Sequence, residues 1–215
     1  MDIRKYNSDD EAQVRKIHLE TYLLGKPIST LTKKLKILSS EADYYINKEP
    51  ENLFVVEDKG NVVGYLFGCL NEKNEPSKIS FIIYVLFNVF KLPFMNKKER
   101  KFWKGRISFI FRLISGKSGE LKLKVPENAG HIHINLLPEA RGKGVGSKLL
   151  KEFFKYAKSK GTKVIHAGSF KTRLNPNSNF WIKNGFKIYD KVNSTFWKSE
   201  YPAEKIELVC YSKKL

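Results

Sequence analysis

The apolar positions along the chain alternate in some segments and recur with helical spacing in others, which predicts a single α/β domain. Before residue 71 the predicted elements are a strand at 3–6, a helix opening near 11, a basic helix at 31–48, and strands at 53–57 and 62–70. The motif Ser8-Asp9-Asp10-Glu11 predicts a capping box that starts the first helix. The turn at 58–61 makes the two later strands a β-hairpin.

After residue 129 the predicted elements are a strand at 131–137, a helix following Gly144, a strand at 163–167, a short helix at 175–183, and strands at 186–189 and 206–211. The helix after Gly144 is the clearest, because its apolar residues fall on one face and its lysines largely on the other. Gly161 is expected to end it as a left-handed cap. This order predicts a mixed sheet covered by helices.

The segment 71–129 fits this alternation least well, and we expect it to be a helical insertion within one domain that covers 1–215. Residues 79–94 are apolar but too short for a bilayer span, which needs about 20 residues. Residues 96–124 hold ten Lys and Arg and two Glu, a net charge of +8, with aromatic residues interleaved. The favoured interpretation is helices that pack on the domain and wall the substrate cleft. The alternative is a segment that lies on an anionic membrane.

The chain is strongly basic, with 40 Lys and Arg against 22 Asp and Glu and a net charge of +18. Such a surface attracts polyanions, although lysine can equally be the default surface residue. The lysines are spread along the chain, so nucleic acid is not an expected partner. Cys69 and Cys210 are the only cysteines, which predicts neither a disulfide framework nor a metal site. The amino terminus lacks the apolar core of a signal peptide, and a cytoplasmic protein is expected.

A glycine-rich turn joins the strand at 131–137 to the following helix, in the order Leu136-Leu137-Pro138-Glu139-Ala140-Arg141-Gly142-Lys143-Gly144-Val145-Gly146-Ser147. Glycines let successive amides face an anion, and the helix dipole adds positive potential at the same place. The order Gly146-Ser147-Lys148 is wrong for a Walker A loop, and the glycine spacing is wrong for a dinucleotide fingerprint. The turn therefore predicts a different kind of pyrophosphate site.

The spacing Arg141-x-x-Gly144-x-Gly146 resembles the acetyl-CoA motif of the GNAT N-acetyltransferase superfamily. The stretch from Asn175 to Phe186 is similar to a second hallmark of that superfamily, an Asn-led helix that ends in Lys-x-Gly-Phe. The hairpin at 62–65 also resembles the GNAT core. Within the superfamily, residues 130–139 resemble the acetyltransferase-like domain of bacterial proteins and O-GlcNAc hydrolases.

The resemblance implies a GNAT fold, with a mostly antiparallel sheet of about seven strands, an insertion before the cofactor-binding strand, and acetyl-CoA as co-substrate. It implies that CoA enters between two splayed strands and that its pyrophosphate meets the amides of 141–146. Its pantetheine arm would pair with backbone near Leu136 and contact Asn175. The implied cofactor-binding residues are Leu136, Arg141, Gly142, Lys143, Gly144, Val145, Gly146, Ser147 and Asn175.

Candidate bases lie on the strand that leads into the turn, where His131, His133 and Asn135 share one face. His133 is expected to take the proton of an amine, with His131 as the second candidate, and Glu57 and Glu139 as weaker ones. Either histidine can instead be hydrogen-bonded within the sheet.

The chain departs from the family pattern at the residue expected to protonate the leaving thiolate, where Trp181 or Ile182 replaces the usual tyrosine. Either another group or water supplies that proton, or the domain binds CoA without efficient catalysis. We favour an N-acetyltransferase that transfers the acetyl group directly to the primary amine of a small molecule. The alternative is a CoA-binding regulatory module whose basic segment 96–124 docks on a membrane or nucleic acid. The sequence leaves a homodimer open.

Overall fold

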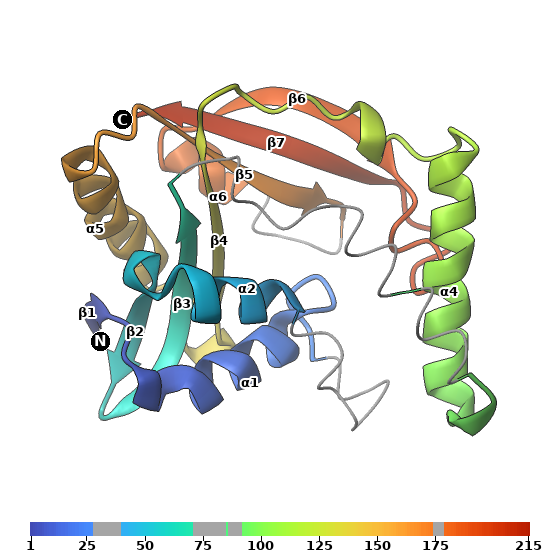
Figure 1. The fold of residues 1–215 in the computed structure, drawn as a ribbon, viewed down its shortest axis with the longest axis horizontal. Coiled ribbons are helices and arrows are strands. Elements are labelled where there is room, and N and C mark those ends of the chain that lie inside the picture. The colour runs from blue at the N-terminus through green and yellow to red at the C-terminus, as the bar shows by residue number, and fades with distance from the viewer. Residues whose placement is uncertain (28–39, 71–84, 86–91, 174–178) are drawn as a thin grey trace.

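The computed structural model describes residues 1–27, 40–70, 85, 92–173 and 179–215, and a seven-stranded sheet forms its centre (Figure 1). The strands are β1 (Asp2–Lys5), β2 (Phe54–Asp58), β3 (Asn61–Cys69), β4 (Gly130–Leu136), β5 (Val164–Lys171), β6 (Lys187–Ser194) and β7 (Ile206–Lys214). The α-helices are α1 (Glu11–Thr21), α2 (Ser40–Lys48), α4 (Lys97–Ile114), α5 (Val145–Ser159) and α6 (Phe180–Lys183). This order confirms the predicted mixed sheet with flanking helices.

The strands follow the order β1-β2-β3-β4-β5-β7-β6, and every neighbouring pair is antiparallel except β4 and β5. This parallel pair is registered only at Gly130 with Ile165 and at His131 with His166. Beyond that point β5 turns away and runs with β7 across the direction of β4, as Figure 1 shows. The sheet therefore opens between β4 and β5 toward their carboxyl ends.

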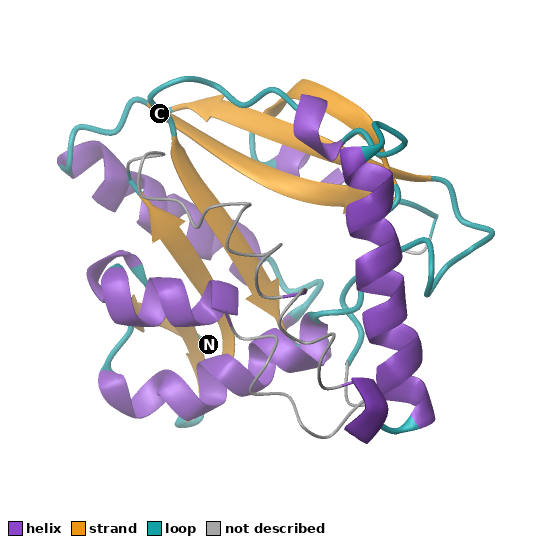
Figure 2. Ribbon diagram, turned by 45° about the vertical axis from the view of Figure 1, so that its right-hand side comes forward, coloured by secondary structure: helices purple, strands orange, loops and turns teal. Residues whose placement is uncertain are grey.

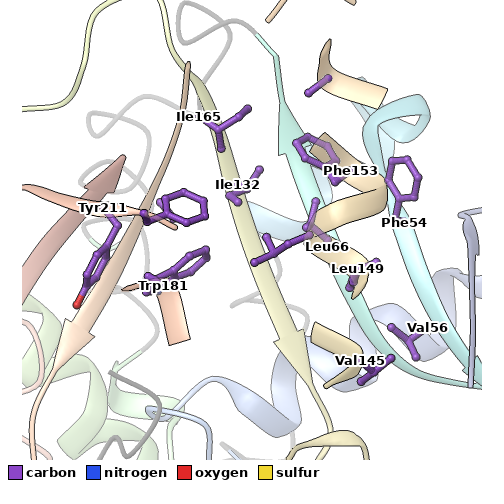
Figure 3. Close-up of a cluster of buried hydrophobic side chains, with 14 of the residues drawn as sticks. Phe54, Val56, Leu66, Ile132, Val145, Leu149, Phe153, Ile165, Trp181 and Tyr211 are labelled. Carbon is purple, nitrogen blue, oxygen red and sulfur yellow. The ribbon is translucent and has the colours of Figure 1, made fainter. Parts of the chain in front are cut away.

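Helix α5 covers one face of the sheet, and α1 and α2 cover the other. Val145, Leu149 and Phe153 of α5 pack against Leu66 and Ile132 in the largest buried cluster (Figure 3). The second cluster joins residues of α1 and α2 to the opposite face of β2 and β3, where Cys69 is fully buried. The apolar and lysine-bearing faces of α5 are as predicted, and Gly161 follows the helix with a φ of +82°.

Helix α4 lies within the predicted basic segment and stands along one side of the molecule (Figures 1 and 2). Its inner face buries Phe102, Trp103 and Ile110 against Trp197, and Arg106 forms an ion pair with Glu200 in the connection between β6 and β7. The prediction that this segment packs on the domain is confirmed for α4. Most of the apolar stretch 79–94 lies outside the described residues. None of the described helices has the length and apolar character of a bilayer span.

The capping box predicted at Ser8 and Glu11 is wrong by one residue. Asn7 is the cap: its backbone is extended, its side chain accepts from the amide of Asp9, and its own amide donates to Asp10 Oδ2 at 2.9 Å. Ser8–Asp10 then forms a 3-10 turn ahead of α1. Asn and Ser cap a helix about equally well, so the backbone angles decide which of the neighbours Asn7 and Ser8 is the cap.

Several predicted bounds differ from the observed ones. Strand β1 begins and ends one residue earlier than predicted, and β5, β6 and β7 each extend several residues further. The pairing of both β5 and β6 along β7 accounts for this extension, because ladder hydrogen bonds hold polar residues in a strand. Of the helix predicted at 31–48, the structure describes α2, and of the one at 175–183 it describes α6, with Asn179 as its cap.

Candidate active site

The turn between β4 and α5 is held open by two glycines with left-handed backbone angles. Gly142 has a φ of +74° and Gly144 a φ of +75°, and a Cβ built on either residue would meet no heavy atom within 4 Å. Residues with a Cβ rarely adopt such backbone angles, and a side chain at either position would fill the open space beside the turn. Gly146 has a different role, because a Cβ there would press on Leu136 and Phe180 at 3.2 Å. It lets the start of α5 lie close to β4.

Within the described chain, only the flanking amides of this turn have hydrogen-bond partners. The amides of Ala140 and Arg141 donate to Leu137 O and Pro138 O, and those of Ser147 and Lys148 donate to Gly144 O. Between them, no described residue accepts a hydrogen bond from the five amides of 142–146. Five amides at the amino terminus of a 15-residue helix form an anion site of the expected kind.

The side chain of Arg141 is hydrogen-bonded to backbone carbonyls of the described chain, and its predicted role in cofactor binding stays a prediction. Its Nε donates to Leu136 O at 2.9 Å, and a terminal nitrogen donates to Gly25 O at 3.2 Å. Burial lowers the pKa of this guanidinium. Arg141 thus ties the end of β4 to the residues after α1, while Lys143 and Ser147 remain exposed at the turn.

The edge of β4 that faces β5 offers further backbone groups. The amide of Leu137 donates to Val63 O of β3 at 2.9 Å. Because backbone groups alternate along a strand, those of Ile132, Ile134 and Leu136 point to the opposite edge. No described strand pairs with that edge beyond His131. The carbonyl of Leu136 accepts from Arg141 Nε, so the predicted role of Leu136 as a backbone partner would fall to its amide.

The predicted polar face of β4 joins a hydrogen-bonded chain. Asn135 Nδ2 lies 3.0 Å from His133 Nε2 and 2.7 Å from Tyr65 Oη, which lies 2.8 Å from His18 Nδ1. His131 belongs to a separate group, with Nδ1 2.9 Å from Tyr45 Oη and its ring centroid 5.0 Å from that of His166. His133 therefore matches the interpretation of a histidine hydrogen-bonded within the sheet, through Asn135 of β4, whereas the partner of His131 is a residue of α2.

The remaining candidates lie elsewhere. Glu57 accepts from Arg4 Nε at 2.8 Å near the start of the sheet, and Glu139 is exposed in the 3-10 turn before Arg141. Trp181 is 6% exposed and packs in the core against Phe186 and Tyr211. Asn175 lies outside the described residues. Among those described, no three His, Cys, Asp or Glu side chains form a metal-binding group.

Four residues of this group were not predicted: His18 of α1, Tyr65 of β3, Tyr45 of α2 and His166 of β5. The hydrogen bonds that link them to one another or to β4 join residues 47, 70 or 86 positions apart. The only local signal is a polar or aromatic residue at a buried position of a predicted element. That signal does not identify a partner across the sheet.

Comparison with known proteins identifies the family of this chain. The model of the acetyltransferase (GNAT) family matches residues 12–186, and no significant match is found among curated protein sequences. The structure named SsHAT superposes with a TM-score of 0.61 at 20% identity, over 99% of this chain and 97% of that one.

Two further solved structures share the fold. An N-acetyltransferase from Staphylococcus aureus Mu50 gives a TM-score of 0.58 at 18% identity, over 99% and 97% of the two chains. The yncA protein of Salmonella typhimurium, solved with its cofactor acetyl-CoA, gives 0.55 at 16%, over 100% and 94%. The chain belongs to the acetyltransferase (GNAT) family and is an acyltransferase that uses acetyl-CoA.

Proposed function

We propose that this protein transfers the acetyl group of acetyl-CoA directly to the primary amine of a small molecule. The observation that carries the proposal is the set of five amides at 142–146 that donate to no described residue, beside the edge of β4 with which no described strand pairs beyond His131. The turn fits a pyrophosphate because Gly142 and Gly144 leave open space where a Cβ would stand. The amides of 142–146 would hold the pyrophosphate, and the edge at Ile134 and Leu136 the pantetheine arm. Asn175 stays a predicted contact to that arm.

His133 would take the proton of the amine. Bound acetyl-CoA supplies the thioester, so the carbon–nitrogen bond forms as the carbon–sulfur bond breaks and the CoA thiolate takes its proton from water. Leaving as a thiolate is feasible, because thiol pKa values are about 8.5. A covalent acyl-enzyme is disfavoured, since Cys69 and Cys210 are both buried. Trp181 is not used, because its indole lies in the core and is a negligible acid.

A neutral or anionic amine, such as an amino acid or amino sugar, is the proposed acceptor. The net charge of +18 opposes the approach of polycations. Kinetics with an amino acid, an amino sugar and a polyamine at equal concentration test this choice. A higher kcat/KM for the polyamine would contradict it. The resemblance of residues 130–139 to the domain found with O-GlcNAc hydrolases is part of the same proposal. A preference of the enzyme for amino sugars over amino acids would support this resemblance.

The alternative function, a docking module, is favoured by the outer face of α4. Lys97, Lys101 and Lys104 are exposed on this face, and Phe111 and Ile114, at 70% and 71% exposed, continue it along the helix. Co-sedimentation with anionic vesicles or with DNA at two salt concentrations separates the two functions. Salt-sensitive binding without turnover would favour the module. Turnover without such binding would exclude it.

A further inference from the structure

Residues 23–26, which follow α1, form a tight turn with a strained backbone. Leu23 and Lys26 exchange two backbone hydrogen bonds of 2.9 and 3.1 Å. The two residues between them both have left-handed angles, with a φ of +53° at Leu24 and of +87° at Gly25. Such a turn favours Asn-Gly at its centre, and a leucine there is unfavourable. Strain of this kind persists only where the surrounding structure holds it, so the contacts of the turn indicate its role.

The side chain of Arg141 holds the centre of this turn. The two hydrogen bonds of the turn do not use Gly25 O, and a terminal nitrogen of Arg141 donates to this oxygen at 3.2 Å. A Cβ built on Gly25 would lie 3.5 Å from the guanidinium, which therefore lies against the glycine. The Nε of the same side chain donates to Leu136 O at 2.9 Å. Because the guanidinium is planar and rigid, it fixes the turn beside the end of β4.

The same turn borders the face of the sheet that carries His133. Tyr22, the residue before the turn, has its ring centroid 5.9 Å from that of His18, and the His18 centroid lies 6.0 Å from that of His133. Leu24 packs against the buried cluster that joins α4 to Trp197. Tyr22, Leu24 and His133 are all partly exposed. The end of α1 and the turn are thus candidate walls for an acceptor whose amine reaches His133.

We infer that Arg141 is a positioning residue of the acceptor site, whose guanidinium holds the 23–26 turn against the end of β4. The inference rests on the proposed function, in which the pantetheine arm follows the edge of β4 and the amine reaches His133. The amides of 142–146 then hold the pyrophosphate without help from the Arg141 side chain. Loss of this side chain should therefore weaken the binding of the amine and leave the binding of acetyl-CoA nearly unchanged.

Two cations of the cofactor turn can be compared directly. Arg141→Met removes both hydrogen bonds, and KM for the amine at saturating acetyl-CoA should rise about 3- to 10-fold, the factor that one hydrogen bond commonly contributes. Its Kd for acetyl-CoA should stay within about twofold of the wild-type value. Lys143→Met removes an exposed cation and should do the reverse, raising Kd for acetyl-CoA with KM for the amine unchanged. A Kd for acetyl-CoA that rises as much in Arg141→Met as in Lys143→Met would make Arg141 a phosphate ligand and overturn the inference.

The contact can also be perturbed from the side of the turn. Gly25→Ala places a methyl group at a φ of +87° against the guanidinium, and it should raise KM for the amine as Arg141→Met does. Because both variants act on one contact, their effects should not multiply in the double variant. Gly161→Ala, with a φ of +82° at the far end of α5, controls for backbone strain and should leave this KM unchanged. An unchanged KM in Gly25→Ala would overturn the inference, also where Arg141→Met fails to fold.

Hydrogen–deuterium exchange gives a readout that does not depend on turnover. The amides of Leu23, Gly25 and Lys26 all donate to backbone carbonyls within residues 21–26. The peptide that spans them should exchange faster in Arg141→Met than in the wild type, and at the wild-type rate in Lys143→Met. Unchanged exchange in Arg141→Met would refute the inference, even if the protein acetylates amines. Faster exchange in a protein that acetylates nothing would support the contact and refute the proposed function alone.

Discussion

Replacing Gly144 with alanine perturbs the turn at one methyl group. Gly144 caps α5 with a φ of +75°, and a Cβ there meets no heavy atom within 4 Å, so the methyl causes no clash inside the protein. It has two separate consequences. The backbone becomes strained, and the methyl occupies open space beside the amides of 142–146, for which the described part of the chain offers no acceptor. The first lowers the stability of the fold, and the second lowers the affinity for the CoA pyrophosphate.

The other end of the same helix provides a matched control. Gly161 has a φ of +82°, and a Cβ there also meets nothing within 4 Å. A left-handed backbone angle costs a residue with a Cβ about 1–2 kcal/mol, so the two alanine variants should be destabilised alike. For a chain of this size, each kcal/mol lowers Tm by about 2–4 °C. The loss of stability caused by the backbone strain therefore cancels when Gly144→Ala is compared with Gly161→Ala.

Thermal unfolding with increasing acetyl-CoA gives the affinity of each protein. A ligand at 100 times its Kd stabilises the folded state by about 2.7 kcal/mol, and a tenfold loss of affinity removes about 1.4 kcal/mol of that stabilisation. We expect Gly161→Ala to keep the wild-type response to acetyl-CoA and Gly144→Ala to lose at least a tenfold factor in Kd. Equal affinities in the two variants would refute the assignment of the pyrophosphate to this turn.

Three further outcomes follow from the structure. Asp10 is buried, and hydrogen bonds from Arg4 lower its pKa, so the stabilisation is present above the ordinary value near 3.9 and is lost as pH falls through the lowered one. Asp10→Asn should cost about 1–3 kcal/mol in urea unfolding at pH 7 and less near pH 2; an equal cost at both would contradict this. Burial lowers the pKa of Lys5 to about 8, so limited acetic anhydride at pH 8 should label Lys5 ahead of most lysines, as peptide mass mapping would show. Trp181→Tyr should not raise kcat, because the side chain faces the core beside Phe186; a clear increase would show that residue 181 reaches the reacting groups.

Local patterns were sufficient to predict the cofactor turn and the elements on either side of it. Helix α5 repeats its apolar positions over four turns. Gly142 and Gly144 have left-handed backbone angles, and the glycines that such angles favour can be recognised directly in the sequence. The alternation along β4 likewise predicted which face carries His131, His133 and Asn135. In each case the information lies within about ten residues.

Long-range contacts account for what the sequence did not predict. Arg141 looks like a phosphate ligand from its position, but its guanidinium donates to Gly25 O, 116 residues away. His133 contacts Asn135, which donates to Tyr65, and Tyr65 in turn contacts His18, so this group depends on how α1 packs on the sheet. Strand β6 is polar and largely exposed, so its length follows from pairing with β7 and has no apolar signal.

Amine-dependent release of free thiol from acetyl-CoA tests the central claim most directly. The purified protein is incubated with acetyl-CoA and a library of small amines, with Gly144→Glu as the control, and acetylated products are identified by mass. The account predicts thiol release that requires an amine, yields a matching acetylated product, and is lost in Gly144→Glu. Tight binding of acetyl-CoA without turnover on any amine would contradict it, and would make this chain a CoA-binding module instead of an N-acetyltransferase.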